Sequence, residues 1–509
     1  MKRIHYVNAF SGVAQVTANI VLTIIIVPVF IKKLGLQTYG VYALISTIGQ
    51  LGVFTNFGFN TTVVKYLAEQ SDRRESNYDI VVTAVVIGVA AISVALLAYL
   101  SRDFILFHLL NLSREVVTSS VYVFFASCIL TNVLVVVGQI PSAVLDSQQK
   151  VYLTNSVQLG VGVLGKLLML GVLLVSPDLG LIGVSLTASS AFGLILFALL
   201  ARRTWGVVSV PSLRTEFFRV ARKHLKYGRS VYATAVTGFF YEPITKILLN
   251  HYLGLAEVGF FDIALRVKTI ILSFAERLLY PVLPLLAAKH SFTESRSIHD
   301  EVQQKLFILV IPAIIAVIFI ARPLVNVWLG PAFSPVIVGI ACIASCYLLA
   351  QTFVPLYQFL LVKGHPDKTF VMQIANVTVN SVLFLLIVPH IGYFGAIVAF
   401  CAAILSSIGL SIWYQSSILH SKLLTTRAFA AKCAWMAGIL SVLNGVSVLL
   451  VRQNWPQMVA LLIANGIGTI AVFRLLKMFS ISDIDQYVGH NNRAAMVLER
   501  ILVARASGR

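Results

Sequence analysis

The chain has 509 residues, of which 58% are hydrophobic and only 12% are charged, and its mean hydropathy is +0.88. Soluble domains carry about 25% charged residues, so the composition excludes an ordinary soluble protein. The formal net charge is +19. We interpret this charge as a signal of orientation in a membrane and as attraction to anionic lipid headgroups. A nucleic-acid partner is not expected, because no soluble domain is left to bind one.

Apolar stretches follow one another almost without interruption along the chain. A hydrocarbon core about 30 Å thick needs about 20 apolar residues per helix, and on this basis the sequence predicts about 14 membrane-spanning helices. The alternating pattern of a β-barrel is absent. The first span follows Met1-Lys2-Arg3 with no small-residue cleavage site, so we expect a permanent span. In chain order, the predicted spans cover residues 6–31, 41–67, 79–100, 116–139, 152–175, 181–200, 229–252, 257–287, 306–329, 335–362, 369–388, 392–418, 428–451 and 457–476.

The longest basic stretch separates the sixth predicted span from the seventh. It runs from Arg202 to Arg229 and contains a single acid, Glu216. We therefore predict an all-α integral membrane protein with two pseudo-symmetric six-helix lobes and two additional C-terminal helices. The predicted divisions are a lobe at 1–200, a basic cytoplasmic linker at 201–228, a lobe at 229–418, two further helices at 419–476, and a cytoplasmic tail at 477–509 with an amphipathic helix at 493–505.

Lysine and arginine in the connecting segments predict the orientation. Most of them lie in the segments on the side of the two chain ends, which the positive-inside rule places in the cytoplasm. The segments on the opposite side contain few: Lys32, Lys33, Arg102, Arg114, Arg322 and Arg452. We expect a multi-pass protein of the bacterial cytoplasmic (inner) membrane, with both termini cytoplasmic.

Two sequence patterns in the first half recur in the second half in the same order. Such repetition indicates that the halves share one structural pattern. In a membrane protein, paired halves predict a cavity between them and transport by alternating access. Leu34-Gly35-Leu36, Gly40 and Tyr42 are echoed by Leu253-Gly254-Leu255, Gly259 and Phe261; Pro177, Gly180 and Gly183 are echoed by Pro389, Gly392 and Gly395.

Charged residues within predicted spans seven and eight are candidate site residues, since a charge at the centre of a membrane helix costs about 2.5–3.5 kcal/mol on insertion scales. Glu242 is one turn from Lys246, and Asp262 is one turn from Arg266, so these could form ion pairs that only fasten helices. The alternative is a solvated cationic surface, which Lys268 favours because no acid lies one turn away. Arg277 and Lys65 lie near the predicted cytoplasmic ends of their spans.

Amide and hydroxyl side chains form stripes on three predicted spans. They line either interhelical hydrogen-bond seams or a hydrated cavity, and cavity lining is favoured for spans one and two because several stripes coexist. The main candidates are Gln15, Asn19, Asn56, Asn60 and Asn376, with Asn8, Ser11 and Thr23 on the same stripe as the first two.

The sequence contains no phosphate-binding glycine loop, nucleophile elbow or paired-histidine metal motif. The five cysteines fall within apolar spans and are interpreted as small core residues. We therefore predict no enzymatic activity, no cofactor and no metal site.

Several segments resemble the polysaccharide biosynthesis transporters, which include the O-antigen type flippases of the multidrug/oligosaccharidyl-lipid/polysaccharide (MOP) superfamily. The resemblance covers most of the chain and preserves motif order. It rests on Pro28, Leu34-Gly35, Tyr39-Gly40-Val41-Tyr42, Asn56-Phe57-Gly58 and Lys65-Tyr66-Leu67-Ala68-Glu69, then on the run from Gly259 to Val267, and on the run from Trp328 to Pro335.

The resemblance implies two six-helix lobes in a V and a polyprenyl-diphosphate-linked oligosaccharide as cargo, with membrane lipids and polysaccharide polymerase machinery as partners. Cations would offset the diphosphate, which makes Lys246, Arg266 and Lys268 the leading ligands, with Arg277 and Lys65 near the entrance. Glu242 and Asp262 would tune these cations or carry protons. The alternatives are a drug/cation antiporter of the same superfamily, which would need a more acidic pocket, and a membrane glycosyltransferase or polymerase, which would need larger loops.

Overall fold

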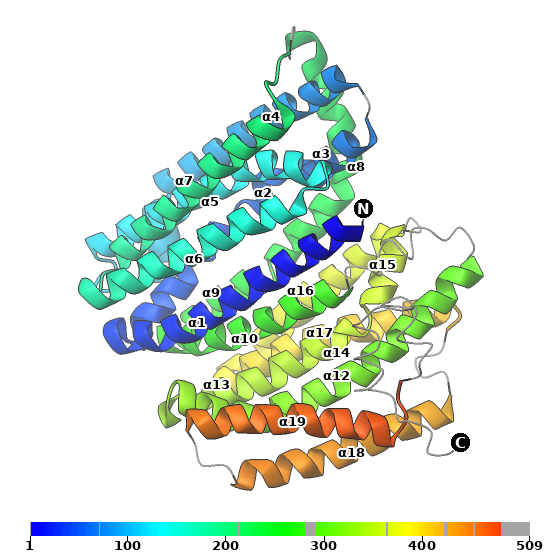
Figure 1. The fold of residues 1–509 in the computed structure, drawn as a ribbon. Helices are drawn as coiled ribbons and strands as arrows, with labels where there is room; N and C mark the ends of the chain where they lie inside the picture. Colours follow the sequence, from blue (N-terminus) through cyan, green and yellow to red (C-terminus); the bar gives the residue numbers. More distant parts are fainter. Residues whose placement is uncertain are drawn as a thin grey trace. The chain divides into compact units, whose positions relative to one another are not determined.

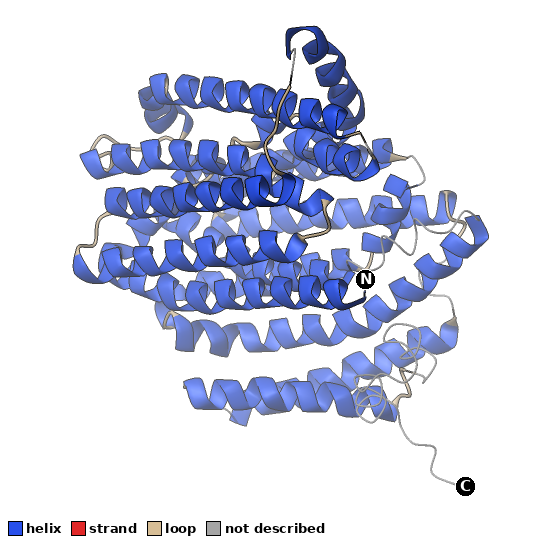
Figure 2. Ribbon diagram, turned by 45° about the horizontal axis from the view of Figure 1, so that its top comes forward, coloured by secondary structure: helices blue, strands red, loops and turns tan. Residues whose placement is uncertain are grey.

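The computed structural model describes residues 2–70, 72–210, 213–279, 292–362, 365–421, 426–450 and 454–479. Within these ranges every regular element is helical (Figure 2). The structure has 11 helical segments there that are long and apolar enough to cross a membrane. The prediction of an all-α integral membrane protein is therefore confirmed. The predicted amphipathic helix at 493–505 lies outside the described residues.

The chain divides into two compact units that differ from the predicted segments. Unit 1 comprises Met1–Ile263 and His365–Ala403, and unit 2 comprises Ala264–Gly364 and Ile404–Arg509. The arrangement of two six-helix lobes plus two helices stays a prediction.

The helices of unit 1 include most of the N-terminal half of the chain (Figure 1). Helix α1 contains Gly35 at φ +84°, a backbone conformation that glycine adopts at little cost, and α1 therefore joins two helices across a kink. The elements are α1 (Lys2–Ile45), η1 (Ile48–Gln50), α2 (Val53–Asn56), α3 (Phe59–Glu69), α4 (Arg73–Leu100), the π-helix η2 (Phe104–Leu109), α5 (Ser119–Ser147), α6 (Val151–Val175), α7 (Leu179–Trp205), α8 (Leu213–Phe239), α9 (Glu242–Tyr252), the first part of α10 (Leu255–Leu279), α16 (Pro366–Ile391) and the first part of α17 (Tyr393–Ser417).

Small residues let α5 and α7 approach closely. A Cβ atom on Gly183 would lie 2.8 Å from Cβ of Ser127, and one on Gly180 would lie 3.1 Å from the carbonyl oxygen of Ser120. Close approach at small residues is a common basis of helix association in membranes, where no hydrophobic effect drives it. Helices α4, α5 and α7 therefore form a layer in which α5 packs against both neighbours.

The predicted seventh span is interrupted in the structure. Helix α8 ends at Phe239, and α9 starts at Glu242 with Pro243 in its first turn. Proline is tolerated there because the first-turn N–H groups have no partner within the helix. The break places Lys246 on α9, a helix separate from α8.

Unit 2 has its core where α12 packs against α18 and α19. Buried Met436, Leu440 and Phe473 belong to this core. The elements are the later parts of α10 and α17 together with α12 (Phe292–Trp328), η3 (Pro331–Phe333), α13 (Ser334–Gly339), the π-helix η4 (Ile340–Ala344), α14 (Ser345–Gln351), α15 (Val354–Val362), α18 (Arg427–Leu450) and α19 (Trp455–Leu475).

Candidate functional site

A buried cluster of charged and hydroxyl groups joins α1, α9 and α10 within unit 1. Nζ of Lys246 lies 2.6 Å from Oδ1 of Asp262, and the hydroxyl of Tyr39 donates to Oδ2 of the same carboxylate at 2.8 Å. Lys246 and Asp262 are each 6% exposed, and Tyr39 is 1% exposed. A charge in such surroundings is tolerated when it is paired and hydrogen-bonded. We call Tyr39, Lys246 and Asp262 the α1–α9–α10 cluster.

Neighbouring side chains hold this cluster in place. The ring of Phe30 packs edge-on against Tyr39 with centroids 5.3 Å apart. Thr245, beside Lys246, accepts a hydrogen bond from Nδ2 of Asn380 on α16 at 2.6 Å. Tyr241, just before α9, stacks on Phe400 with centroids 4.3 Å apart. The positions of Lys246 and Asp262 are therefore fixed by packing on several sides.

The two copies of the sequence repeat meet next to this cluster in a reciprocal contact. A Cβ atom on Gly40 would lie 2.0 Å from the carbonyl oxygen of Leu255, and one on Gly259 would lie 2.8 Å from Cδ1 of Leu36. Gly40 and Gly259 are equivalent positions of the repeat, and so are Leu36 and Leu255. Each copy thus places its leucine against the glycine of the other. We call Leu36, Gly40, Leu255 and Gly259 the glycine crossing.

A second polar cluster joins α1 to α6. Nζ of Lys166 donates to the carbonyl oxygen and Oδ1 of Asn19, at 2.7 and 3.0 Å, and to Oγ1 of Thr23 at 2.9 Å. Three contacts match the three donors of an ammonium group. Nε2 of Gln15 donates to Oε1 of Gln158 at 2.9 Å. The described part of the α1 stripe therefore forms an interhelical seam, and cavity lining by the same residues stays a prediction.

The sequence reasoning missed Lys166, although the signal was direct. A lone lysine in the middle of an apolar stretch is expected to have a functional or structural partner. The polar stripes alone suggested that the spans of the first half carry no charged side chain. Lys166 shows that one of them does.

Replacing Asn19 with alanine should lower the free energy of unfolding by about 2 kcal/mol, because the Lys166 ammonium loses an acceptor in a poorly solvated position. Gln15→Ala is the matched control. It removes a bond between two neutral amides and should cost about 0.6 kcal/mol, which is typical of an interhelical hydrogen bond in a membrane. Thermal unfolding of the detergent-purified variants measures both, and equal effects would contradict this role of the seam.

A third buried network lies where α8 packs against α3 and α4. The Asp79 carboxylate is fully buried, and each of its oxygens lies 2.9 Å from Nζ of Lys223. Nε2 of His224 lies 3.0 Å from Oδ1 of Asp79, and its Nδ1 lies 2.5 Å from the hydroxyl of Thr62. Lys223 also sits over the ring of Tyr66, 4.1 Å from its centroid. This network fastens the first half of α8 to α3 and α4.

Sequence reasoning also missed this network, because Lys223 and His224 fall in the stretch predicted to be a linker. The structure places them on α8, which begins at Leu213 within that stretch. An amphipathic pattern over the linker could have indicated a packed helix.

The other predicted site residues are distributed over both units. Lys268 is 6% exposed and lies over the ring of Tyr347 at 4.8 Å, within unit 2. Arg266 is half-buried in unit 2, whereas Glu242 and Lys65 are half-buried in unit 1. The side chain of Arg277 is outside the described part of the structure.

The predicted amide residues of span two form hydrogen bonds to α5 and to the next helix, and Asn376 of span eleven forms one within its own helix. Nδ2 of Asn56 donates to Oε1 of Gln139 at 2.7 Å, and its Oδ1 accepts from the backbone N–H of Asn60 at 3.1 Å. Nδ2 of Asn376 donates to Oε1 of Gln373 at 3.0 Å. Of the predicted charged candidates within unit 1, Lys246 and Asp262 form an ion pair between the neighbouring helices α9 and α10. The pairs predicted one turn apart, Glu242 with Lys246 and Asp262 with Arg266, stay predictions.

Residues 8–290, more than half of the chain, match a known family, described as polysaccharide biosynthesis protein. The chain belongs to this family. The probable flippase AglR of Haloferax volcanii is 24% identical over 423 residues, covering 78% of this chain and 80% of AglR.

Solved structures share the fold at low sequence identity. The lipid II flippase MurJ in an inward closed conformation gives a TM-score of 0.66 at 12% identity, covering 93% of this chain and 98% of MurJ. An inward-facing multidrug resistance MATE family transporter of the MOP superfamily gives 0.64 at 12% identity, covering 81% of this chain and 99% of that transporter. These likenesses show that the chain shares the fold of these transporters, and its apolar helices make it a multi-pass membrane protein. The family match confirms the predicted resemblance to the polysaccharide biosynthesis family.

Proposed function

We propose that this protein turns a polyprenyl-diphosphate-linked oligosaccharide from the cytoplasmic to the outer leaflet, for polysaccharide or O-antigen biosynthesis. The family match is the observation that carries the proposal. The name of AglR, a probable flippase, supports the class of transport. Both termini would face the cytoplasm in a bacterial inner membrane, as the distribution of lysine and arginine favours.

The chemistry of such a cargo explains why buried cations are needed. The lipid tail can remain in the bilayer, whereas the diphosphate and the sugars cross a layer that cannot solvate them. Lysine and arginine bind phosphate oxygens through charge-assisted hydrogen bonds. We propose Lys246 as the principal ligand, with Arg266 and Lys268 as further candidates in unit 2.

The Lys246–Asp262 pair supports a mechanism in which one anion replaces another. In the structure the carboxylate of Asp262 satisfies the Lys246 ammonium. An arriving diphosphate could take its place without leaving that charge unpaired, which would be costly. Asp262 would keep the hydrogen bond from Tyr39 and would take up a proton, so that its carboxyl group is not left as an uncompensated buried charge. Substrate binding would thereby loosen the contact between α9 and α10.

Alternating access by this protein would require at least one contact between the two repeats that closes one side of the pathway. The glycine crossing has the properties of such a contact, because its two glycines let α1 and α10 approach closely, and the hydrogen bond from Tyr39 to Asp262 joins the same two helices beside it. The glycine crossing lies next to the α1–α9–α10 cluster. Substrate binding at the cluster would therefore favour separation of α1 from α10 at the crossing.

A transport assay tests the proposal directly. Proteoliposomes containing the purified protein should expose a fluorescently labelled polyprenyl-diphosphate oligosaccharide to a membrane-impermeant quencher faster than protein-free vesicles. In cells, removal of the gene should cause a lipid-linked oligosaccharide to accumulate on the cytoplasmic side and surface polysaccharide to fall. Equal exposure rates with and without the protein would contradict the proposal.

The alternative of a drug/cation antiporter has one supporting observation, the similar TM-score of the multidrug transporter fold. Such a transporter would bind its cargo through acids, and the Asp262 carboxylate is here already bound by Lys246 and Tyr39. Proton-driven uptake of a fluorescent organic cation into the same proteoliposomes, with no effect on the labelled lipid, would favour the antiporter.

A further inference from the structure

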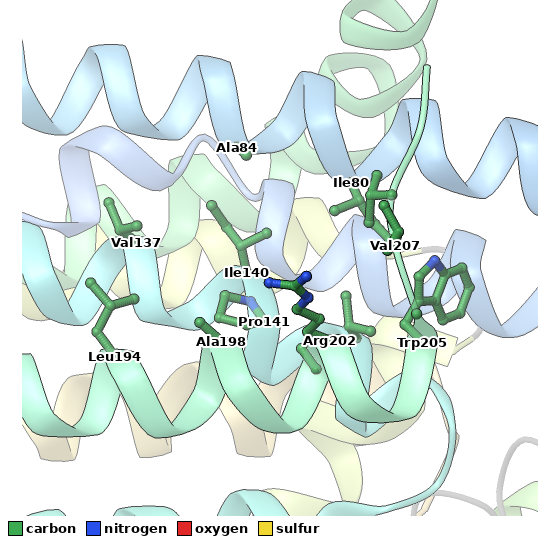
Figure 3. A pocket seen from close by; sticks show the side chains of 14 residues that line it. Ile80, Ala84, Val137, Ile140, Pro141, Leu194, Ala198, Arg202, Trp205 and Val207 are labelled. Carbon is green, nitrogen blue, oxygen red and sulfur yellow. The ribbon is translucent and has the colours of Figure 1, made fainter. Parts of the chain in front are cut away.

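An apolar groove of about 610 Å³ runs between α4 and α7 over a floor formed by α5 in unit 1. Pockets of about 300–1,000 Å³ are typical of small-ligand sites. Figure 3 shows the side chains lining it, from Val137 and Leu194 at one end to Arg202 and Trp205 at the other. Arg202 is the charged residue in this lining.

Small side chains account for the hollow. Ala84 on α4 and Ala198 and Ala201 on α7 face the groove, where larger residues would close it. Pro141 on α5 has no backbone N–H, so the usual helical hydrogen bond to the carbonyl of Val137 is not made at this point. The groove is therefore a feature of this sequence rather than a gap between ordinary helix faces.

The charged end of the groove is held by specific contacts. Nε1 of Trp205 donates to Oδ1 of Asn77 at 2.9 Å, and Nδ2 of Asn77 donates to the carbonyl oxygen of Ser209 at 3.2 Å. Gly206, at φ +90°, turns the chain back so that Val207 joins the lining. Asn77 thus ties the segment after α7 to α4 and closes the end of the groove.

Two guanidinium groups lie at this end. Arg202 is exposed at the groove, and the guanidinium of Arg73 lies over the ring of Trp205, 5.5 Å from its centroid. Within the part of the chain that the structure describes, neither Arg202 nor Arg73 forms a salt bridge with a carboxylate. Arginine with tryptophan at the end of a membrane helix is the usual composition of the lipid headgroup region.

The faces beside the groove are those of lipid-exposed helices. Val89 and Ile92 on α4 are 60% and 62% exposed, and Ile195 and Leu199 on α7 are 56% and 59% exposed. These side chains require an apolar environment, which in a membrane is supplied by acyl chains. The groove is therefore open to lipids of the bilayer.

We propose that this groove binds an anionic phospholipid of the cytoplasmic leaflet, distinct from the transported substrate. One acyl chain lies along the floor formed by Val137, Ile140 and Val144. The phosphate meets the guanidinium groups of Arg202 and Arg73. The lipid fills the space between α4 and α7 and stabilises the position of the segment that leads into α8. The two guanidinium groups require an anionic headgroup, and the apolar lining of the groove requires a hydrocarbon chain.

Quenching of Trp205 by brominated lipids tests this site in the full-length protein. A variant in which Trp328, Trp413, Trp435 and Trp455 are replaced by phenylalanine leaves Trp205 as the single tryptophan. In nanodiscs, dibrominated phosphatidylglycerol should quench Trp205 with an apparent affinity roughly fivefold above that of dibrominated phosphatidylcholine. A variant that retains only Trp413, which is 59% exposed to the bulk lipid, should show no such preference.

Substitutions on adjacent positions separate the site from general surface charge. Arg202→Gln should remove the preference, whereas Arg203→Gln, on the same turn but outside the groove lining, should keep it. Arg202→Lys retains the charge and should keep a preference above that of Arg202→Gln. Ala198→Phe should reduce quenching by both lipids by filling the groove.

Equal quenching by the two lipids, or equal effects of the Arg202 and Arg203 variants, would overturn the proposal. Recovery of Trp205 fluorescence on adding unbrominated polyprenyl phosphate would also overturn it, by assigning the groove to the substrate tail.

Discussion

Replacing Gly40 with alanine is expected to lower the free energy of unfolding by about 3 kcal/mol, at the upper end of the usual cost of overpacking. The added Cβ would lie 2.0 Å from the carbonyl oxygen of Leu255 and 2.8 Å from its carbonyl carbon. Both are backbone atoms, so no change of rotamer can make room, and α1 and α10 must separate. Because Tyr39 is the neighbouring residue, the hydrogen bond to Asp262 would also be disturbed. The midpoint of thermal unfolding in detergent measures the effect.

Two other glycines provide graded controls. A Cβ on Gly259 would meet the end of the Leu36 side chain at 2.8 Å, which can partly move away, so Gly259→Ala should cost about 1 kcal/mol. A Cβ on Gly88, within α4, would meet nothing within 4 Å, and alanine there should be neutral or stabilise the helix by up to about 1 kcal/mol. If Gly40→Ala were as stable as Gly88→Ala, the two copies of the repeat would not meet as closely as the structure shows.

The sequence predicted the fold class, an all-α membrane protein, because the signal of a membrane helix is local, but it did not predict the breaks within spans such as the seventh. A run of apolar residues long enough to cross a bilayer indicates a helix whatever it packs against. The repeat was also visible, since its glycines recur at matching positions. The contact between Gly40 and Leu255 could not be predicted. A sequence repeat shows that two segments are alike, but it does not show that they are in contact.

The ion pair between Lys246 and Asp262 could not be predicted from residue spacing within one helix, because it depends on how two helices pack. Lys246 and Asp262 are 16 residues apart and lie on different helices, α9 and α10. Spacing along one helix predicts only pairs one turn apart, such as Glu242 with Lys246, and these pairs stay predictions. The Asp79 network was missed for a related reason: an acid at the start of one helix and a histidine in a basic stretch become partners once α8 folds against α3 and α4.

Replacing Asp262 with alanine should have the largest effect on the site, a loss of about 3–5 kcal/mol in the free energy of unfolding, because the Lys246 ammonium would remain buried without its counter-charge. Lys246→Met/Asp262→Asn is the matched variant. It removes both charges at similar volume, and the asparagine amide can still accept the hydrogen bond from Tyr39. Its stability should lie within about 1 kcal/mol of the unmodified protein. Thermal unfolding of both variants measures this difference.

Transport by the neutral pair then separates the two roles that Lys246 could have. If the ion pair only fastens α9 to α10, a variant that restores stability should restore transport as well. Under the proposed mechanism the diphosphate loses its ligand, and hydrogen bonds to charged groups contribute about 1.5–3 kcal/mol, so transport of the labelled lipid should fall roughly 10- to 100-fold. A stable Lys246→Met/Asp262→Asn protein that transports at the unmodified rate would remove Lys246 from substrate binding. A stable but slow protein would support Lys246 as a ligand of the diphosphate rather than as a fastening between α9 and α10.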